Sequence, residues 1–142
     1  MINNEIKKEI CNLIETSKIA YVSSIDADGI PNTKAMLTQN QSNLTTHYFS
    51  TNFSAKRTQQ FIKNPNASIY FCDEADYKGL MLIGKMEVLT DKEHKTMLWH
   101  DGDEIYYPNG IDDEDYCVFK FTAVKGNYYH GLKNCDFNVE DI

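Results

Sequence analysis

Short β-rich runs joined by hairpin-length turns make up most of this sequence, and they constrain its fold more than any other feature. The runs cover residues 18–25, 32–39, 44–50, 67–72, 79–89, 116–124 and 127–130. Turns as short as Asp26–Gly29 join antiparallel strands, because a parallel pair needs a crossover of about a dozen residues. We therefore predict a mainly antiparallel sheet that begins as a meander of the first three runs. Within 142 residues, six or seven strands are expected to close into a barrel.

Helices are expected in three places beside this sheet. Residues 3–16 repeat apolar side chains at spacings of three and four, which is typical of an amphipathic helix. A second helix is expected to begin with Ser54 as its N-cap and to end before Pro65. Residues 90–99 open with Thr-Asp-Lys-Glu, the pattern of a capping box, and predict a third.

Two further features bear on the outline of the fold. Gly84 lies in the middle of the run 79–89 and predicts a bulge or a sharp bend there. Residues 132–142 have no strong pattern and are expected to form an acidic tail. We predict a single domain over residues 1–142.

Composition and charge exclude several classes of protein. The content of 9 Tyr, 7 Phe and 1 Trp excludes a disordered chain, and the net charge of -7 argues against a nucleic-acid binder. No apolar run approaches the ~20 residues of a membrane span, and the N-terminal sequence lacks the apolar core of a signal peptide. A cytoplasmic location without membrane attachment is therefore expected. The 4 Cys form no CxxC motif, so reduced thiols are expected and no metal site.

The acidic stretch 100–115 holds 7 carboxylates and no Lys or Arg. It lacks the spacing of a calcium-binding loop, so we expect a solvated loop. Trp99 and Tyr107 lie at and within this stretch. Aromatic side chains in such a place pack on a core, on a partner subunit or on a flat ligand, and the sequence leaves the three open.

The segment after the third run is the strongest candidate for a binding site. It is expected to be a strand end, a turn and a helix N-terminus, where unpaired N–H groups and the helix dipole attract anions such as phosphate. The hydroxyl groups of Ser50, Thr51 and Ser54 are close in sequence to Lys56 and Arg57, the latter being the chain's one arginine. An ordinary capped surface helix with two solvated cations is the alternative.

Residues that suit acid–base catalysis are not grouped in the sequence. There is no G-x-S-x-G, P-loop or G-x-G-x-x-G motif, and His47 is expected to pack within a strand. Lys34, on the second run, is either an exposed strand lysine or, if the second and third runs pair, a neighbour of the phosphate turn. A phosphate site with aromatics and no acid–base set is typical of a protein whose cofactor supplies the chemistry.

Four pairs of stretches occur in a recognisable order between residues 5 and 131. They are Asp28–Pro31 with Lys34–Met36, Tyr48–Ser50 with Ser54–Lys56, Leu82–Val88 with Asp91, and Leu98–Trp99 with Tyr107–Gly110. In this order the chain resembles the pyridoxamine 5'-phosphate oxidase-like FMN-binding split-barrel family, and within it the small general-stress-protein branch. The resemblance implies a six-stranded antiparallel split β-barrel with short helices, and a homodimer with FMN sites at the subunit interface.

The resemblance also implies which residues would hold the FMN. Ser54 and Lys56 would bind the phosphate, with Thr51 and Arg57 beside it, and Phe49 and Ser50 would flank the cofactor. The isoalloxazine edge would run along Lys34, Ala35, Met36 and Leu37. Trp99 and Tyr107 would lie near the site or its dimer lid. No metal is implied.

The chain departs from the oxidases themselves in ways that change the expected activity. Ser54-Ala55-Lys56 stands where the oxidases have Ser-Arg-Lys, and the arginine-containing C-terminal segment that grips the vitamin substrate has no counterpart. We therefore expect an FMN-dependent oxidoreductase that acts on another small molecule. The alternatives are a non-catalytic module that binds flavin or haem for sensing or storage, and an enzyme of the nitroimidazole-reductase-like branch.

Overall fold

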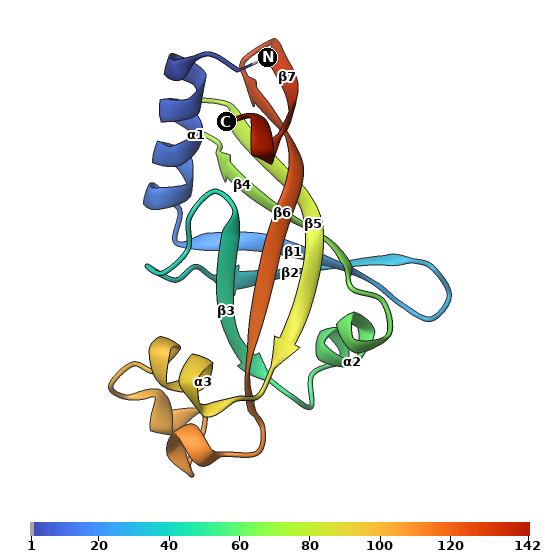
Figure 1. Cartoon of the computed structure of the whole chain (residues 1–142), viewed down its shortest axis with the longest axis vertical. Helices are drawn as coiled ribbons and strands as arrows, with labels where there is room; N and C mark the ends of the chain where they lie inside the picture. The colour runs from blue at the N-terminus through green and yellow to red at the C-terminus, as the bar shows by residue number, and fades with distance from the viewer. Residues whose placement is uncertain (1) are drawn as a thin grey trace.

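The computed structural model describes residues 2–142, in which three α-helices pack against seven β-strands (Figure 1). The elements are α1 (Asn4–Thr16), β1 (Ile19–Ile25), β2 (Pro31–Leu37), β3 (Thr46–Asn52), α2 (Lys56–Lys63), β4 (Asn66–Asp73), β5 (Lys78–Leu89), α3 (Lys92–Leu98), β6 (Tyr116–His130) and β7 (Lys133–Asn138). Short 3₁₀ helices cover Asp103–Ile105, Gly110–Asp112 and Val139–Asp141. None of the described helices is long and apolar enough to cross a membrane.

All strand pairs are antiparallel, as predicted, and they follow the order β2-β1-β4-β5-β6-β3 with β7 also on β6. The sheet curls but does not close, because no ladder joins β2 to β3 among the described residues. The predicted hairpin of β1 and β2 is confirmed. The predicted pairing of β2 with β3 is wrong, since β3 pairs with β6.

Aromatic pairs explain why β3 leaves the meander. Across the β3–β6 ladder His47 stands opposite Phe121 and Phe49 stands opposite Phe119, and all four side chains are buried. Cross-strand aromatic pairs of this kind are a main source of sheet stability. They depend on a partner far along the chain, which local turn signals do not specify.

The C-terminal segment is not a tail. Residues 133–138 form β7 on the edge of β6, and Phe137 and Val139 are buried. The two final runs expected at 116–124 and 127–130 form one continuous strand of 15 residues. Gly126 lies within it, where the ring of Phe137 occupies the space that a Cβ would need. The seventh strand therefore adds to the six implied by the resemblance.

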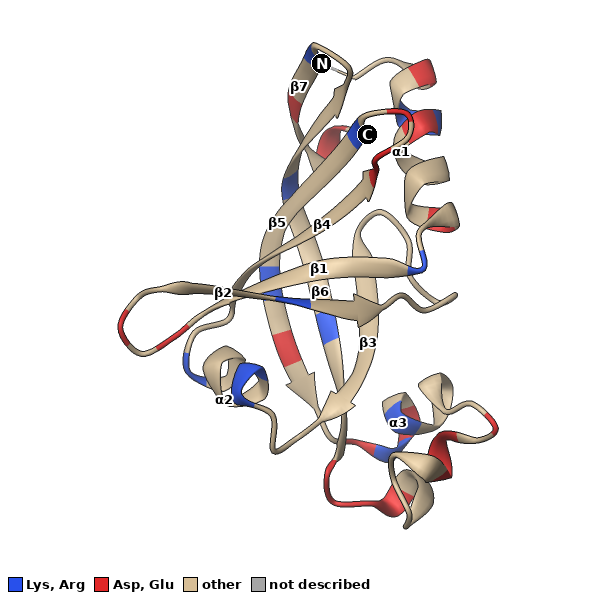
Figure 2. Ribbon diagram, turned by 180° about the vertical axis from the view of Figure 1, so that it is seen from behind, with Lys and Arg blue, Asp and Glu red and all other residues tan. Residues whose placement is uncertain are grey.

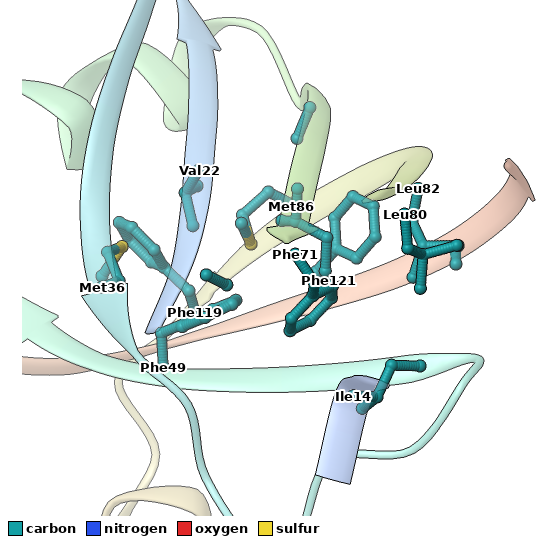
Figure 3. Close-up of a cluster of buried hydrophobic side chains, with 14 of the residues drawn as sticks. Ile14, Val22, Met36, Phe49, Phe71, Leu80, Leu82, Met86, Phe119 and Phe121 are labelled. Carbon is teal, nitrogen blue, oxygen red and sulfur yellow. The ribbon is translucent and has the colours of Figure 1, made fainter. Parts of the chain in front are cut away.

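The main core lies inside the curled sheet, between its inward faces and the apolar stripe of α1 (Figure 3). Ile10, Leu13 and Ile14 supply that stripe, and Asn3 caps the helix by accepting a hydrogen bond from the N–H of Ile6. A second small core lies under α3 at the far end of β6, and Figure 1 shows α3 at the opposite end of the molecule from α1. The predicted capping box of α3 is wrong, because Asp91 is the N-cap.

The bulge predicted at Gly84 is confirmed, since the β5–β6 register shifts between Ile83 and Gly84. A Cβ at Gly84 would overlap the carbonyl oxygen of Thr122, which is fixed backbone. We expect Gly84→Ala to lower the free energy of unfolding by about 1–3 kcal/mol in urea denaturation, because the two strands must separate locally. The control is Val124→Thr at a mainly exposed site on β6, which should change it by less than about 0.5 kcal/mol. Equal values for the two variants would contradict the close approach at Gly84.

Candidate functional site

The turn between β3 and α2 is held by Asp115, which immediately precedes β6. Its carboxylate accepts hydrogen bonds from Asn52 Nδ2 at 2.9 Å, from the Ser54 N–H at 2.8 Å and from Ser54 Oγ at 3.1 Å. Its carbonyl oxygen accepts from the N–H of Phe53 at 2.7 Å. These donors, with Asn52 the strongest, hold the pKa of the Asp115 carboxyl below its usual value. Sequence reasoning placed Asp115 in a solvated loop and missed this role.

The hydrogen bonds to Asp115 give Ser54 a different role from the one predicted. The N-cap of α2 is Ala55, which offers no side-chain hydrogen bond, so the prediction of a Ser54 cap is wrong. A phosphate bound by the Ser54 hydroxyl would first have to displace the Asp115 carboxylate. The N–H groups of Lys56 and Arg57, in the first turn of α2, have no hydrogen-bond acceptor within residues 2–142.

Arg57 is a half-buried cation without a counter-charge. Its Nη2 donates to Thr51 Oγ1 at 2.5 Å, and its Nε is fully enclosed and unpaired in the described chain. None of the salt bridges among residues 2–142 involves Arg57 or Lys56. Because a buried guanidinium is stabilised by an anion on its open donors, this arrangement fits a phosphate ligand.

Ser50 lies on the other face of β3 from Thr51, because successive side chains of a strand alternate. Its Oγ is also fully enclosed and has no hydrogen-bond partner in residues 2–142. Ser50 shares a face of β3 with Tyr48, which packs against the second core under α3. Phe49 is 1% exposed and belongs to the main core. The structure therefore joins Arg57 to Thr51, places Lys56 beside the hairpin cleft, and keeps Ser50 on the other face of β3 and Phe49 in the main core.

A shallow cleft of about 540 Å³ lies between α2 and the turn of the β1–β2 hairpin. Lys56 and Ser54 line it, but so do Asp26 and Asp28, and Figure 2 shows acidic residues at the tip of the β1–β2 hairpin. Hydrogen bonds from the Ile30 N–H, and then from Asn32, keep the pKa of Asp26 low. The two carboxylates of the hairpin turn disfavour a phosphate in the cleft itself.

The residues expected along the isoalloxazine lie on β2, an edge strand with one unpaired side. Met36 points into the core, and Lys34 shares its face two residues earlier but is exposed. Ala35 and Leu37 point outward opposite Tyr21 and Ile19 of β1. Leu37 is 69% exposed, and with Ile19, Tyr21 and Ala35 it forms an exposed apolar surface, here called the hairpin face.

Trp99 and Tyr107 pack together in the second core rather than around an open cleft of this chain. Their ring centroids are 6.2 Å apart, and Tyr107 lies 4.6 Å from Tyr116. Burial raises the pKa of Tyr107 well above its usual value. Lys95, which the sequence did not single out, is buried there and donates from Nζ to the Asp113 carbonyl at 3.1 Å.

The remaining candidates behave as ordinary structural residues. His47 is buried between Phe71 and Phe121, as the packing prediction required, and burial lowers its pKa to about 4. All four cysteines are free thiols, and burial raises the pKa of Cys117 to about 11. Within residues 2–142 no cluster of His, Cys, Asp and Glu could hold a metal ion.

The fold and its β3–α2 turn can now be compared with known proteins. A sequence profile described as pyridoxamine 5'-phosphate oxidase matches residues 6–130. The chain belongs to this family. Among curated protein sequences, none matches it significantly.

Solved structures agree with this assignment. A Clostridium acetobutylicum protein related to general stress protein 26, of the pyridoxinephosphate oxidase family, is 42% identical with a TM-score of 0.88, and the alignment covers 99% of each chain. A pyridoxamine 5'-phosphate oxidase-related, FMN-binding protein from Nostoc punctiforme is 10% identical with a TM-score of 0.69, covering 94% of this chain and 87% of that one. A heme-binding protein from Mycobacterium smegmatis is 14% identical with a TM-score of 0.78, covering 99% and 60%. The last two likenesses show the fold alone.

We expect Asp115→Ala to destabilise the protein at neutral pH by about 1–2 kcal/mol, because it removes the acceptor of three hydrogen bonds. The folded-state pKa of Asp115 is lowered, so its contribution is present above the unfolded value of about 3.9 and is lost as the pH falls through the folded value. Urea denaturation at pH 7 and pH 3 measures the difference, which should shrink at pH 3. Asp112→Ala, at an exposed residue without a side-chain hydrogen bond in the described chain, is the control. A loss that is equal at both pH values would contradict the assignment.

Proposed function

We propose that this protein binds FMN, with the phosphate held by the side chains of Arg57 and Lys56 and the free N–H groups at the start of α2. The observation that carries the proposal is the half-buried guanidinium of Arg57, which has an enclosed, unpaired Nε and no carboxylate partner in residues 2–142. A dianionic phosphate beside the guanidinium would supply the counter-charge that residues 2–142 do not provide.

The proposal assigns the phosphate contacts to residues that differ in part from those expected from the sequence. The N–H and hydroxyl of Ser54 already donate to the Asp115 carboxylate. We therefore assign the main cationic contact with the phosphate to Arg57 and a second contact to the exposed Lys56. Ser50 is left out of the phosphate contacts because it lies on the other face of β3 from Thr51, and Phe49 is left out because its side chain is buried in the main core. Thr51, which was expected beside the phosphate, is assigned the role of a positioning residue. Its hydroxyl accepts a hydrogen bond from Arg57 Nη2 and so fixes the guanidinium.

The flavin ring is placed along β2. The outer side of this edge strand leaves backbone N–H and C=O groups of Lys34–Leu37 without strand partners, and the ring edge of a flavin needs such groups. When bound, FMN supplies hydride transfer, and the protein binds and orients it. An oxidoreductase that acts on a small molecule is the activity we infer, and the match to the pyridoxamine 5'-phosphate oxidase family supports it.

A second copy of the chain is proposed to complete the site. The hairpin face of Ile19, Tyr21, Ala35 and Leu37 is an apolar surface on the strands that would carry the flavin. Exposed apolar patches that adjoin a site are typical of subunit interfaces. Dimerisation through this face would cover the patch and bring residues of the partner to the ring.

Haem binding is the alternative that a structural neighbour raises. The side chains of this chain do not favour it. Nε2 of His47 is engaged by the Leu44 carbonyl at 3.1 Å, and the other three histidines each lie beside a carboxylate: His94 by Asp91, His100 by Asp103 and His130 by Glu9. The visible spectrum separates the two, since a haem protein shows a Soret band and a flavoprotein shows flavin bands. On flavin-loaded protein, oxidation of a nicotinamide donor with and without a nitroimidazole tests the nitroimidazole-reductase-like alternative.

The phosphate assignment predicts a preference for FMN over riboflavin, which has the same ring and no phosphate. We expect Arg57→Gln to weaken FMN binding about 10- to 100-fold and to leave riboflavin binding unchanged, since only the charged contact is lost. Fluorescence titration with both flavins measures the ratio. Lys56→Gln should weaken FMN binding less than Arg57→Gln.

The matched control is Lys63→Gln, at the other end of α2, which should leave both affinities within about twofold. A protein that takes up neither flavin would remove the proposed function. A protein that binds FMN and riboflavin equally would keep flavin binding and remove the phosphate site.

The dimer proposal predicts that a charge on the hairpin face disrupts assembly. We expect wild-type protein to sediment as a dimer at micromolar concentration and Leu37→Lys to raise the dissociation constant at least about tenfold, because a buried lysine would have no partner there. Val124→Lys, at another exposed apolar residue, should remain dimeric. A monomeric wild-type protein, or a dimer unchanged by Leu37→Lys, would contradict this interface.

A further inference from the structure

The N-terminal half of α1 has few contacts with the sheet. The buried apolar residues of the helix, Ile10, Leu13 and Ile14, lie from its middle onward, and Ile6 before them is only partly buried. Cavities of about 280, 380 and 540 Å³ each have residues of α1 in their walls. Segments with few buried apolar contacts open locally more readily than the rest of a fold. Polar contacts therefore contribute strongly to the docking of this half of α1.

Glu9 supplies polar contacts between this half of α1 and the sheet. Its Oε2 accepts a hydrogen bond from the Tyr128 hydroxyl at 3.3 Å, and its Oε1 lies 3.3 Å from His130 Nδ1. Both partners are on β6, where residues two apart share a face. Within residues 2–142 no Lys or Arg forms an ion pair with Glu9. The counter-charge of Glu9 in the described chain is therefore the protonated form of His130.

His130 faces a second carboxylate with its other ring nitrogen. Its Nε2 lies 3.7 Å from Asp76 Oδ2, in the turn between β4 and β5. A neutral imidazole has a proton on one nitrogen and a lone pair on the other, whereas the imidazolium has a proton on both. In either neutral tautomer, a lone pair therefore faces one of the two carboxylates. The imidazolium satisfies both, and so links α1 to the β4–β5 turn through β6.

The other charged groups around His130 favour its protonated form. Lys78 of β5 and Lys133 of β7 stand opposite it in the two ladders. Lys78 lies 3.0 Å from the Asp76 carboxylate, and its hydrogen bond holds the pKa of that carboxyl below the usual value. Asp73 is opposite Lys78 on β4, and Glu5 of α1 lines the same cavity as His130. With Glu9, four carboxylates and two lysines surround the imidazole, which leaves its surroundings negative.

We propose that protonated His130 docks the N-terminal half of α1 on the sheet, and that this half loosens as the pH rises and His130 becomes neutral. The docked helix offers the imidazolium two carboxylates, and an undocked helix removes Glu9 from it. Docking therefore favours the protonated form, so the stability that it adds is present in acid and is lost as the pH rises through the range in which histidine titrates, about pH 5 to 8. The device is independent of the flavin proposal, and either can fail alone.

Amide hydrogen exchange followed by NMR at pH 6 and pH 8 tests the proposal on the wild-type protein. The readout is the protection factor, which corrects for the intrinsic pH dependence of exchange. We expect protection at residues 7–10 to fall about two- to fivefold from pH 6 to pH 8, the range of a partly exposed ion pair. Protection at residues 13–16, in the other half of the helix, should change by less than about 1.5-fold.

Three variants assign the pH dependence to one contact. His130→Gln keeps a side chain that forms hydrogen bonds but does not titrate, and it should abolish the fall in protection. Glu9→Gln removes the carboxylate of α1 and should abolish it as well. The matched control is His100→Gln, at an exposed histidine beside Asp103 in the loop after α3, which should retain the fall.

Several results would overturn the proposal. Wild-type protection at residues 7–10 that is constant between pH 6 and pH 8, or that rises, would do so. So would a fall that persists in His130→Gln or in Glu9→Gln, or one that is lost equally in His100→Gln. Each measurement is made without added flavin, so its outcome does not depend on flavin binding.

Discussion

Strand β6 is paired along both edges, and this pairing fixes the end of β3, where the turn to α2 and the proposed phosphate contacts begin. It carries β5 on one edge and β3 followed by β7 on the other. The β3–β6 ladder places Asn52 opposite Tyr116, directly after Asp115, so the end of β3 meets the carboxylate that holds the following turn. The ladder thereby fixes the point at which the chain turns from β3 into α2.

The same pairing leaves β2 unpaired on one side. A sheet that ends in a free edge exposes backbone groups, and proteins cover such edges or use them. Here the free edge carries the stretch Lys34–Leu37, and its outer face is apolar. We propose that a flavin binds along this edge and that a second subunit packs on the apolar face. Both surfaces are available because β2 does not pair with β3 among the described residues.

Arg57 illustrates which features of the candidate site can be predicted from local sequence and which cannot. The sequence placed a basic pair in the first turn of a helix that follows a strand, which was enough to predict an anion site. The resemblance put Lys56 on the phosphate and Arg57 beside it, and our proposal reverses that order because Arg57 is the more buried of the two. The sequence could not show this difference in burial. Nor could it show that Ser54 is taken by Asp115, a residue on a separate element 61 positions later. The sequence left open whether Trp99 and Tyr107 pack on a core, on a partner subunit or on a flat ligand. In the structure both pack in the second core under α3.

The sequence by itself determined the antiparallel class, the amphipathic helix α1, the bend at Gly84 and the family, because each rests on periodicity, a single residue type or a local motif. Only the tertiary structure decided that β3 pairs with β6, that residues 133–138 are a strand and that Arg57 is a half-buried cation without a carboxylate partner in the described chain. Each of these depends on contacts between segments far apart in the chain. Their free energy comes from burial and pairing, which no local pattern records.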